Sequence, residues 1–204
     1  MKTRPAAAPH KVRIIGGQWR RTPLAVVSAA GLRPTPDRVR ETLFNWLGND
    51  LSGRVCLDLY AGTGALGLEA ASRGASTVWL ADNEPRVQLA LQAIVERLKA
   101  TDRVRLYRGD ARGLLARLSM QGVRADLVFI DPPFRQGALD TIMPALTPVL
   151  ASEAWVYVET ETPLSAEQVA LWCGPQAQIV RQASAGQVHY HLLRIQPEAK
   201  QETS

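Results

Sequence analysis

The sequence predicts an α/β fold with a mostly parallel sheet of seven strands that ends in an antiparallel hairpin. From residue 54 onward, short apolar segments alternate with amphipathic segments of helical period, which is typical of strands joined by right-handed helical crossovers. The stretch Val55–Gly67 passes from an apolar run through a carboxylate into a glycine-rich turn, the strand–turn–helix unit that holds a cofactor in such folds. These observations predict an α/β domain with a ligand crevice at one edge of its sheet.

The first 30 residues are expected to form a basic arm and a hairpin ahead of the main domain, residues 31–204. Residues 1–10 contain basic residues, alanines and prolines without the apolar segment of a signal peptide, so we expect a disordered arm. Two short strands, Val12–Gly17 and Gln18–Val27, are expected to meet at a pair of glycines.

A helix is expected to follow, with Thr35 as its N-cap, Pro36 at its first position and Asp37 in its first turn. Its apolar side chains recur at helical spacing and form one face for burial. They are Val39, Leu43, Trp46 and Leu47.

Five parallel strands and two hairpin strands are expected in the main domain. The parallel ones are Arg54–Leu59, Thr77–Ala81, Val104–Tyr107, Leu127–Ile130 and Trp155–Glu159, and the hairpin consists of Gln178–Ala183 and Gln187–Ile195. The first crossover is expected to contain a helix over Ala65–Arg73 that ends at Gly74. In the second crossover, we expect Asn83 to cap a helix that begins at Pro85.

Composition and charge limit the classes of function. No apolar run is long enough for a membrane span, and the two cysteines, Cys56 and Cys173, form neither a disulfide framework nor a metal cluster, so we expect a cytoplasmic protein without a metal. Residues 1–45 hold nine Lys and Arg against two acidic residues, a net charge of +7, whereas the whole chain has +5. This concentrated basic segment is either a solubilising tail or a surface for a polyanion.

RNA contact is the favoured interpretation, because so little acid balances the arginines of the hairpin. Guanidinium groups pair with phosphates and an aromatic ring stacks on a base, although Trp19 could instead pack on the main domain. Arg38 and Arg40 could meet a phosphate or a cofactor carboxylate, or could be solvated helix charges. The residues expected to contact RNA are Arg13, Trp19, Arg20, Arg21, Arg33, Arg38 and Arg40.

Four of the expected parallel strands have an aspartate at or just beyond their carboxyl end, where open parallel sheets bind ligands. They are Asp58, Asp82, Asp110 and Asp131. Asp82 lies 20 residues after Gly62, the separation at which a carboxylate accepts hydrogen bonds from ribose hydroxyls. Asp110 is placed to accept from an exocyclic amino group such as adenine N6. These two roles fit NAD and S-adenosylmethionine equally well.

Asp58 distinguishes between the two cofactors. A carboxylate directly before the glycine turn is unfavourable beside a pyrophosphate but favourable beside the ammonium and sulfonium groups of S-adenosylmethionine. We therefore expect S-adenosylmethionine as the cofactor and S-adenosylhomocysteine as its product.

The segment Asp131-Pro132-Pro133-Phe134 directly follows an expected strand and matches what methylation of a base amino group requires. Such a nitrogen is a poor nucleophile, because its lone pair is delocalised into the ring. Asp131 and the Pro132 carbonyl can accept hydrogen bonds from its two N–H groups, the prolines stiffen the segment, and Phe134 can stack on the base. We interpret these four residues as the catalytic segment in preference to a structural turn.

Three segments together resemble a known family: Arg33–Leu47, the Asp58–Gly67 loop, and Asp131–Phe134, with the opening Arg13–Arg20 also matching. The family is the bacterial 16S rRNA (guanine(966)-N2)-methyltransferases, and the resemblance covers nearly the whole chain in order. Tyr60 stands where phenylalanine is expected and Asp82 where glutamate is common, and neither change removes a required acceptor.

The resemblance implies a Rossmann-like class I methyltransferase fold, S-adenosylmethionine as donor, and N2 of a guanine in small-subunit ribosomal RNA as acceptor. It also implies a partly or fully assembled small ribosomal subunit as substrate. By position, Asp131–Phe134 would hold the base. The residues expected to bind the cofactor are Asp58, Ala61, Gly62, Gly64, Leu66, Asp82, Asn83, Asp110 and Ala111.

Two alternatives remain open. One is another amino-methyltransferase, acting on adenine N6 or cytosine N4 of a nucleic acid or on a protein glutamine, although a DNA enzyme would usually need a separate target-recognition region. The other is a non-catalytic RNA-binding assembly factor, against which the intact Asp131–Phe134 segment argues. For the favoured function we expect a monomer.

Overall fold

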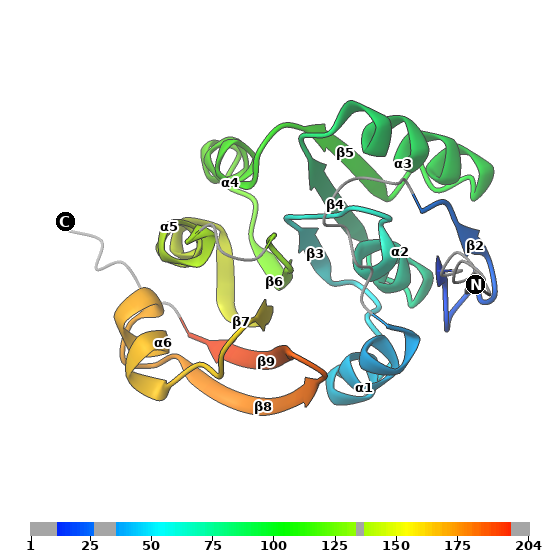
Figure 1. Cartoon of the computed structure of the whole chain (residues 1–204). Helices are drawn as coiled ribbons and strands as arrows, with labels where there is room; N and C mark the ends of the chain where they lie inside the picture. Colours follow the sequence, from blue (N-terminus) through cyan, green and yellow to red (C-terminus); the bar gives the residue numbers. More distant parts are fainter. Residues whose placement is uncertain (1–11, 27–35, 134–136, 197–204) are drawn as a thin grey trace, which may run out of the picture.

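The computed structural model describes residues 12–26, 36–133 and 137–196 (Figure 1). The main sheet consists of β3 (Val55–Asp58), β4 (Thr77–Asp82), β5 (Val104–Arg108), β6 (Ala125–Ile130), β7 (Leu150–Thr160), β8 (Gln178–Ala185) and β9 (Val188–Ile195). The helices are α1 (Asp37–Leu47), α2 (Ala65–Ser72), α3 (Pro85–Arg97), α4 (Ala111–Met120), α5 (Ala138–Leu146) and α6 (Ala166–Cys173), and a 3-10 turn follows α5 at Thr147–Val149.

The strand order of the sheet is β5-β4-β3-β6-β7-β9-β8. The five strands from β5 to β7 are parallel, and β9 pairs antiparallel with both β7 and β8. The order reverses at β3, from which the chain proceeds to β4 and β5 on one side and later to β6 and β7 on the other. The predicted seven-stranded sheet with a final antiparallel hairpin is confirmed, and a reversal of this kind is where such sheets bind ligands.

Helices cover both faces of the sheet (Figure 1). Helices α1, α2 and α3 pack with the inward side chains of one face, including Cys56 and Phe129. Helices α4, α5 and α6 pack on the other face against a second cluster that includes Leu57 and Val128. Residues 56 and 57 alternate between the two clusters, as the two-residue period of a strand requires. Among the described residues, no helix is both long and apolar enough to cross a bilayer.

The N-terminal hairpin is much shorter than expected. Among residues 12–26, pairing is limited to β1 (Val12–Arg13) and β2 (Pro23–Leu24), so the predicted strands Val12–Gly17 and Gln18–Val27 are wrong in length. Two backbone donors of the segment between them bond to the C-terminal end of α2. The backbone N–H of Gln18 donates to the carbonyl of Ser72 at 2.7 Å, and that of Trp19 donates to the Ser72 hydroxyl at 2.9 Å. The arm and the domain boundary at residue 30 lie outside the described residues, so this division of the chain stays a prediction.

Two helix starts differ slightly from expectation. Helix α1 begins at Asp37 with Pro36 as its N-cap residue, one position later than predicted. Helix α3 begins at Pro85 as expected, but its N-cap is Glu84 rather than Asn83, because the Glu84 carboxylate accepts a hydrogen bond from the Arg86 N–H. Both differences leave the order of elements unchanged.

Candidate functional site

A glycine-rich turn joins β3 to α2 and is hydrogen-bonded to the end of the neighbouring strand β4. The N–H of Ala61 donates to the carbonyl of Ala81 at 2.9 Å, and the N–H of Gly62 donates to the Asp82 carboxylate at 3.0 Å. Gly64, with φ of 75°, is the N-cap residue of α2. The turn is therefore held beside Asp82, one of the carboxylates expected to bind the cofactor.

The glycines at 64 and 67 are required for close packing. A Cβ atom at Gly64 would lie 2.8 to 2.9 Å from the side chains of Leu91 and Leu68, so this glycine lets the turn pack against α2 and α3. A Cβ at Gly67 would collide with Leu80 of β4, which confirms the prediction that this position brings helix and strand together.

Asp58 is buried under this turn, with 2% of its surface exposed. Its carboxylate accepts a hydrogen bond from the Gly67 N–H at 2.9 Å, near the N-terminus of α2. Burial raises the pKa of Asp58 to about 7; the amides of Gly67 and Tyr60 oppose this rise, and the nearby charge of Asp82 adds to it. The site thus contains a carboxylate whose charge the protein alone does not fully compensate.

Substitution of Asp58 by asparagine is expected to change how stability depends on pH. Between about pH 4 and pH 7 the folded protein keeps a proton on Asp58 that the unfolded chain releases, since its pKa rises from 3.8 to about 7. The stabilising contribution of this proton is complete below about pH 4 and is lost as the pH rises through about 7. The free energy of unfolding of the wild type minus that of Asp58→Asn should therefore fall across this range, as measured by urea unfolding at several pH values.

Asp50→Asn is the matched control for this measurement. Asp50 is exposed and accepts hydrogen bonds from the backbone and hydroxyl of Ser52, which lower the pKa of its carboxyl. The free energy of unfolding of the wild type minus that of Asp50→Asn should not fall between pH 4 and 7. The reason is that a carboxyl with a lowered pKa contributes its stability at the upper end of the range. A flat difference for Asp58→Asn would show that the Asp58 carboxyl is not desolvated.

The other strand-end aspartates have distinct surroundings. Asp82 is half-buried and its second oxygen accepts from the Glu84 N–H at 2.9 Å. Asp110 is exposed and is the N-cap residue of α4, where it accepts from the Gly113 N–H at 2.7 Å. Both carboxylates lie at the carboxyl edge of the sheet, on the side of β3 occupied by β4 and β5.

Asp131 lies at the same edge on the other side of β3. Strands β3 and β6 are parallel neighbours with Asp58 paired to Phe129, and the Leu59 N–H donates to the Phe129 carbonyl at 3.1 Å. Asp131 therefore lies two residues beyond the partner of Asp58 and directly follows β6. Pro132 is buried and Pro133 is exposed, whereas Phe134 lies outside the described residues.

Glu159 is a further acidic side chain at this edge, and the sequence alone predicted no role for it. Glu159 is near the end of β7, with 5% of its surface exposed, and accepts a hydrogen bond from the buried Tyr157 hydroxyl at 2.8 Å. Burial and the charge of Glu159 raise the pKa of Tyr157 well above its usual value, and the charge of Asp131 adds to this rise. One sequence signal could have identified Glu159: it is an acidic residue at the end of an apolar run, in the strand that follows β6 along the chain.

The residues expected to contact RNA divide into exposed and buried groups. Arg13, Arg20, Arg21 and Arg38 are exposed, and Arg33 lies outside the described residues. Trp19 retains 9% of its surface and Arg40 none, so placing these two at an RNA surface is corrected by the structure. Trp19 belongs to the core cluster beside α1–α3, with the Arg103 guanidinium 5.8 Å from its ring centroid, which leaves little of its ring for stacking on a base.

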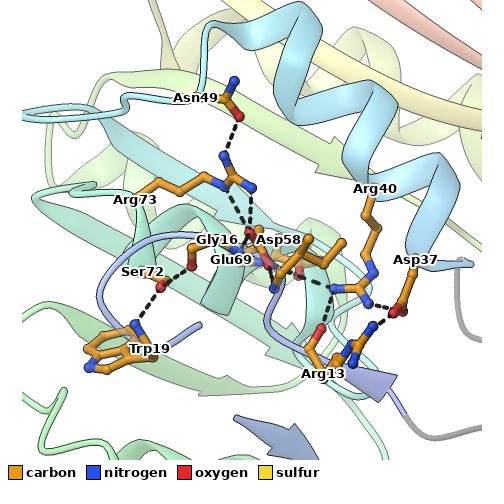
Figure 2. A network of polar contacts seen from close by, with 12 residues as sticks. Arg13, Gly16, Trp19, Asp37, Arg40, Asn49, Asp58, Glu69, Ser72 and Arg73 are labelled. Carbon is orange, nitrogen blue, oxygen red and sulfur yellow. Dashed lines mark hydrogen bonds and ion pairs between the residues drawn. The ribbon is translucent and has the colours of Figure 1, made fainter. Parts of the chain in front are cut away.

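Arg40 is buried because it belongs to an ion-pair network around Glu69 of α2 (Figure 2). The Arg40 guanidinium donates to the Arg13 carbonyl at 2.9 Å and to the Asp37 carboxylate at 2.7 Å, and lies 3.8 Å from Glu69. Glu69 is fully buried and also pairs with Arg73 at 2.8 Å. The network joins the N-terminal segment, α1 and α2, so the arginine expected to bind a ligand has a structural role.

Arg20 and Arg21 lie far from the glycine turn. Their loop contacts Ser72 at the C-terminal end of α2, and the turn is at the other end of the same helix. A helix of eight residues is about 12 Å long. The two places are therefore separated by about the length of α2.

Comparison with known proteins gives consistent matches over most of the chain. A model of the family described as "Conserved hypothetical protein 95" matches residues 12–194. Ribosomal RNA small subunit methyltransferase D of Escherichia coli (strain K12) is 43% identical over 185 residues, 89% of each chain. The protein of the same name from Haemophilus influenzae is 38% identical over 157 residues, 76% of this chain and 81% of that one. A solved structure described as putative methyltransferase yhhF from Escherichia coli superposes with a TM-score of 0.78 at 40% identity, covering 93% of this chain and 100% of that one.

Proposed function

Because the chain belongs to the Conserved hypothetical protein 95 family, we propose that it is an S-adenosylmethionine-dependent methyltransferase of 16S ribosomal RNA. Its acceptor is the exocyclic N2 of a guanine, guanine 966, in the assembled small subunit, and the enzyme acts in the cytoplasm as a monomer. The names of the relatives support the reaction and the class of RNA. The observation that carries the proposal is the position of Asp131, beside the glycine turn at the carboxyl edge of the sheet.

The residues around the glycine turn fit this cofactor. S-adenosylmethionine supplies an activated methyl group and carries positive charges at its amino-acid end. The buried Asp58 carboxylate, with its raised pKa, is stabilised by a cation nearby and would be further destabilised by a pyrophosphate. Asp82, held at the turn through Gly62, is assigned to the ribose hydroxyls, and Asp110 to the adenine amino group.

Asp131 and Pro132 are assigned to the acceptor base. The Asp131 carboxylate and the Pro132 carbonyl accept hydrogen bonds from the N2 amino group, which turns the nitrogen lone pair toward the methyl group. Catalysis by alignment of this kind can contribute about 7–11 kcal/mol. Pro133 stiffens the segment, and Phe134 is assigned to stacking on the base.

The proposal is tested by tritium transfer from labelled S-adenosylmethionine. Small subunits that lack the modification should be labelled, whereas naked RNA and DNA should be labelled weakly or not at all, and mapping should place the methyl group on guanine N2. Labelling of adenine, cytosine or protein would support another amino-methyltransferase. Absence of label in every nucleic acid would leave the non-catalytic assembly factor as the better account.

Replacement of both Arg20 and Arg21 by alanine is expected to weaken subunit binding and to flatten its salt dependence. Both side chains are exposed, and each phosphate contact contributes about 0.7 to 0.9 to the slope of log K against log salt. Loss of two contacts should therefore reduce the slope by about 1.5. Binding titrations at several salt concentrations give this slope directly.

Arg105→Ala combined with Arg181→Ala is the control, since both are exposed arginines on the two edge strands, β5 and β8. This pair removes the same charge and should leave the slope closer to that of the wild type. If the two double variants have the same slope, the RNA surface does not include the loop of Arg20 and Arg21.

A further inference from the structure

Glu159 lies beside Asp131 at the edge where the acceptor base is expected. Strands β6 and β7 are parallel neighbours with Phe129 paired to Tyr157, and Asp131 and Glu159 each follow two residues later. By the two-residue period of a strand, Glu159 lies on the face of the sheet that carries Asp58, and Asp131 directly follows the end of β6 beside it. Neighbouring strands are about 4.8 Å apart, and the charges of both carboxylates act on the Tyr157 hydroxyl, so the two acidic groups are close enough for one base to lie between them.

The surroundings of Glu159 are aromatic. Tyr190 is its partner on the antiparallel strand β9, and the Tyr190 ring stacks on Trp46 of α1 with centroids 5.4 Å apart. The Tyr157 ring lies 6.4 Å from that of Tyr190. Glu159 is thus an acidic side chain with an aromatic wall on one side and Asp131 on the other.

We propose that Glu159 determines the preference for guanine by accepting a hydrogen bond from its N1–H while Asp131 accepts from N2. This inference rests on the proposed function and adds a residue that selects the base. Guanine presents adjacent N1–H and N2–H donors on its Watson–Crick edge. Adenine and cytosine have an amino group as well, but the neighbouring ring nitrogen is an acceptor, which a carboxylate repels.

The Tyr157 hydroxyl is expected to increase the preference for guanine over adenine and cytosine. By donating to one Glu159 oxygen at 2.8 Å, it orients the carboxylate. The raised pKa of Tyr157 keeps the hydroxyl protonated at neutral pH. With 5% of its surface exposed, Glu159 has little water to compensate for a mismatched partner, so a wrong base leaves an unfavourable contact.

Glu159→Gln tests this role because the amide keeps an oxygen for Tyr157 and gains a donor for adenine N1 or cytosine N3. Initial rates are measured on small subunits with guanine or adenine at the mapped position. The guanine rate should fall about tenfold or more, and the ratio of guanine to adenine rates should also fall at least about tenfold. Affinity for S-adenosylmethionine should be unchanged. A folded variant that keeps the wild-type ratio would overturn the inference.

Two further variants separate the possible outcomes. Glu153→Gln makes the same change at an exposed position of β7 and should preserve the wild-type ratio. If Glu159→Gln does not fold, Tyr157→Phe replaces it: loss of the orienting hydroxyl should lower the ratio about threefold, and an unchanged ratio contradicts the inference. Failure of the wild type to methylate guanine-containing subunits would instead refute the proposed function itself.

Discussion

Replacement of Asp131 by alanine is expected to lower the rate of methyl transfer to the small subunit by about 10²- to 10⁴-fold. The reason is that the base nitrogen becomes a useful nucleophile only when its N–H groups are held by acceptors, and Asp131 is assigned as one of them. The substitution lies beyond the end of β6 and outside the glycine turn, so affinity for S-adenosylmethionine should remain within about twofold. Tritium transfer gives the rate, and equilibrium binding gives the affinity.

Asp102→Ala is the control, because Asp102 is an exposed aspartate in the turn before β5. It should have the activity of the wild type. Equal losses of rate and of cofactor affinity in Asp131→Ala would mean that this carboxylate binds the cofactor. A fully active Asp131→Ala variant would remove the acceptor from the proposed mechanism.

Replacement of Glu69 by alanine is expected to lower the free energy of unfolding by about 3–5 kcal/mol. Besides its ion pairs, the Glu69 carboxylate accepts hydrogen bonds from the N–H groups of Ile15 at 2.6 Å and Gly16 at 2.7 Å. Its removal leaves the fully buried Arg40 guanidinium with less opposing charge and leaves two backbone donors without this acceptor. Urea unfolding followed by circular dichroism measures the loss.

Glu41→Ala provides the comparison on an exposed glutamate of α1 and should change stability by less than about 0.5 kcal/mol. Because Glu69 joins the N-terminal segment to α2, amide exchange in residues 12–24 should also become faster in Glu69→Ala. A loss below about 1 kcal/mol would indicate that water or rearranged side chains replace the carboxylate.

Much of the fold could be predicted because its signals are local. A strand that ends in a carboxylate and a glycine turn can be recognised from about a dozen consecutive residues. Gly67 has the close-packing role that its position in this stretch predicts. The strands that follow were found because apolar runs in parallel sheets are short and are separated by capped helices. The length of the N-terminal hairpin was missed because the backbone donors of Gln18 and Trp19 bond to Ser72, more than 50 residues away in sequence.

The sequence by itself determined the order of the strands along the chain, the glycine turn and the aspartates at the strand ends, because each depends on neighbours in the chain. Only the tertiary structure decided that Trp19 and Arg40 are buried and that Glu69 pairs with two arginines. It alone also placed Glu159 next to Asp131. Burial and pairing of charged groups depend on which distant segments meet, and a residue's type does not specify its partner across the sheet.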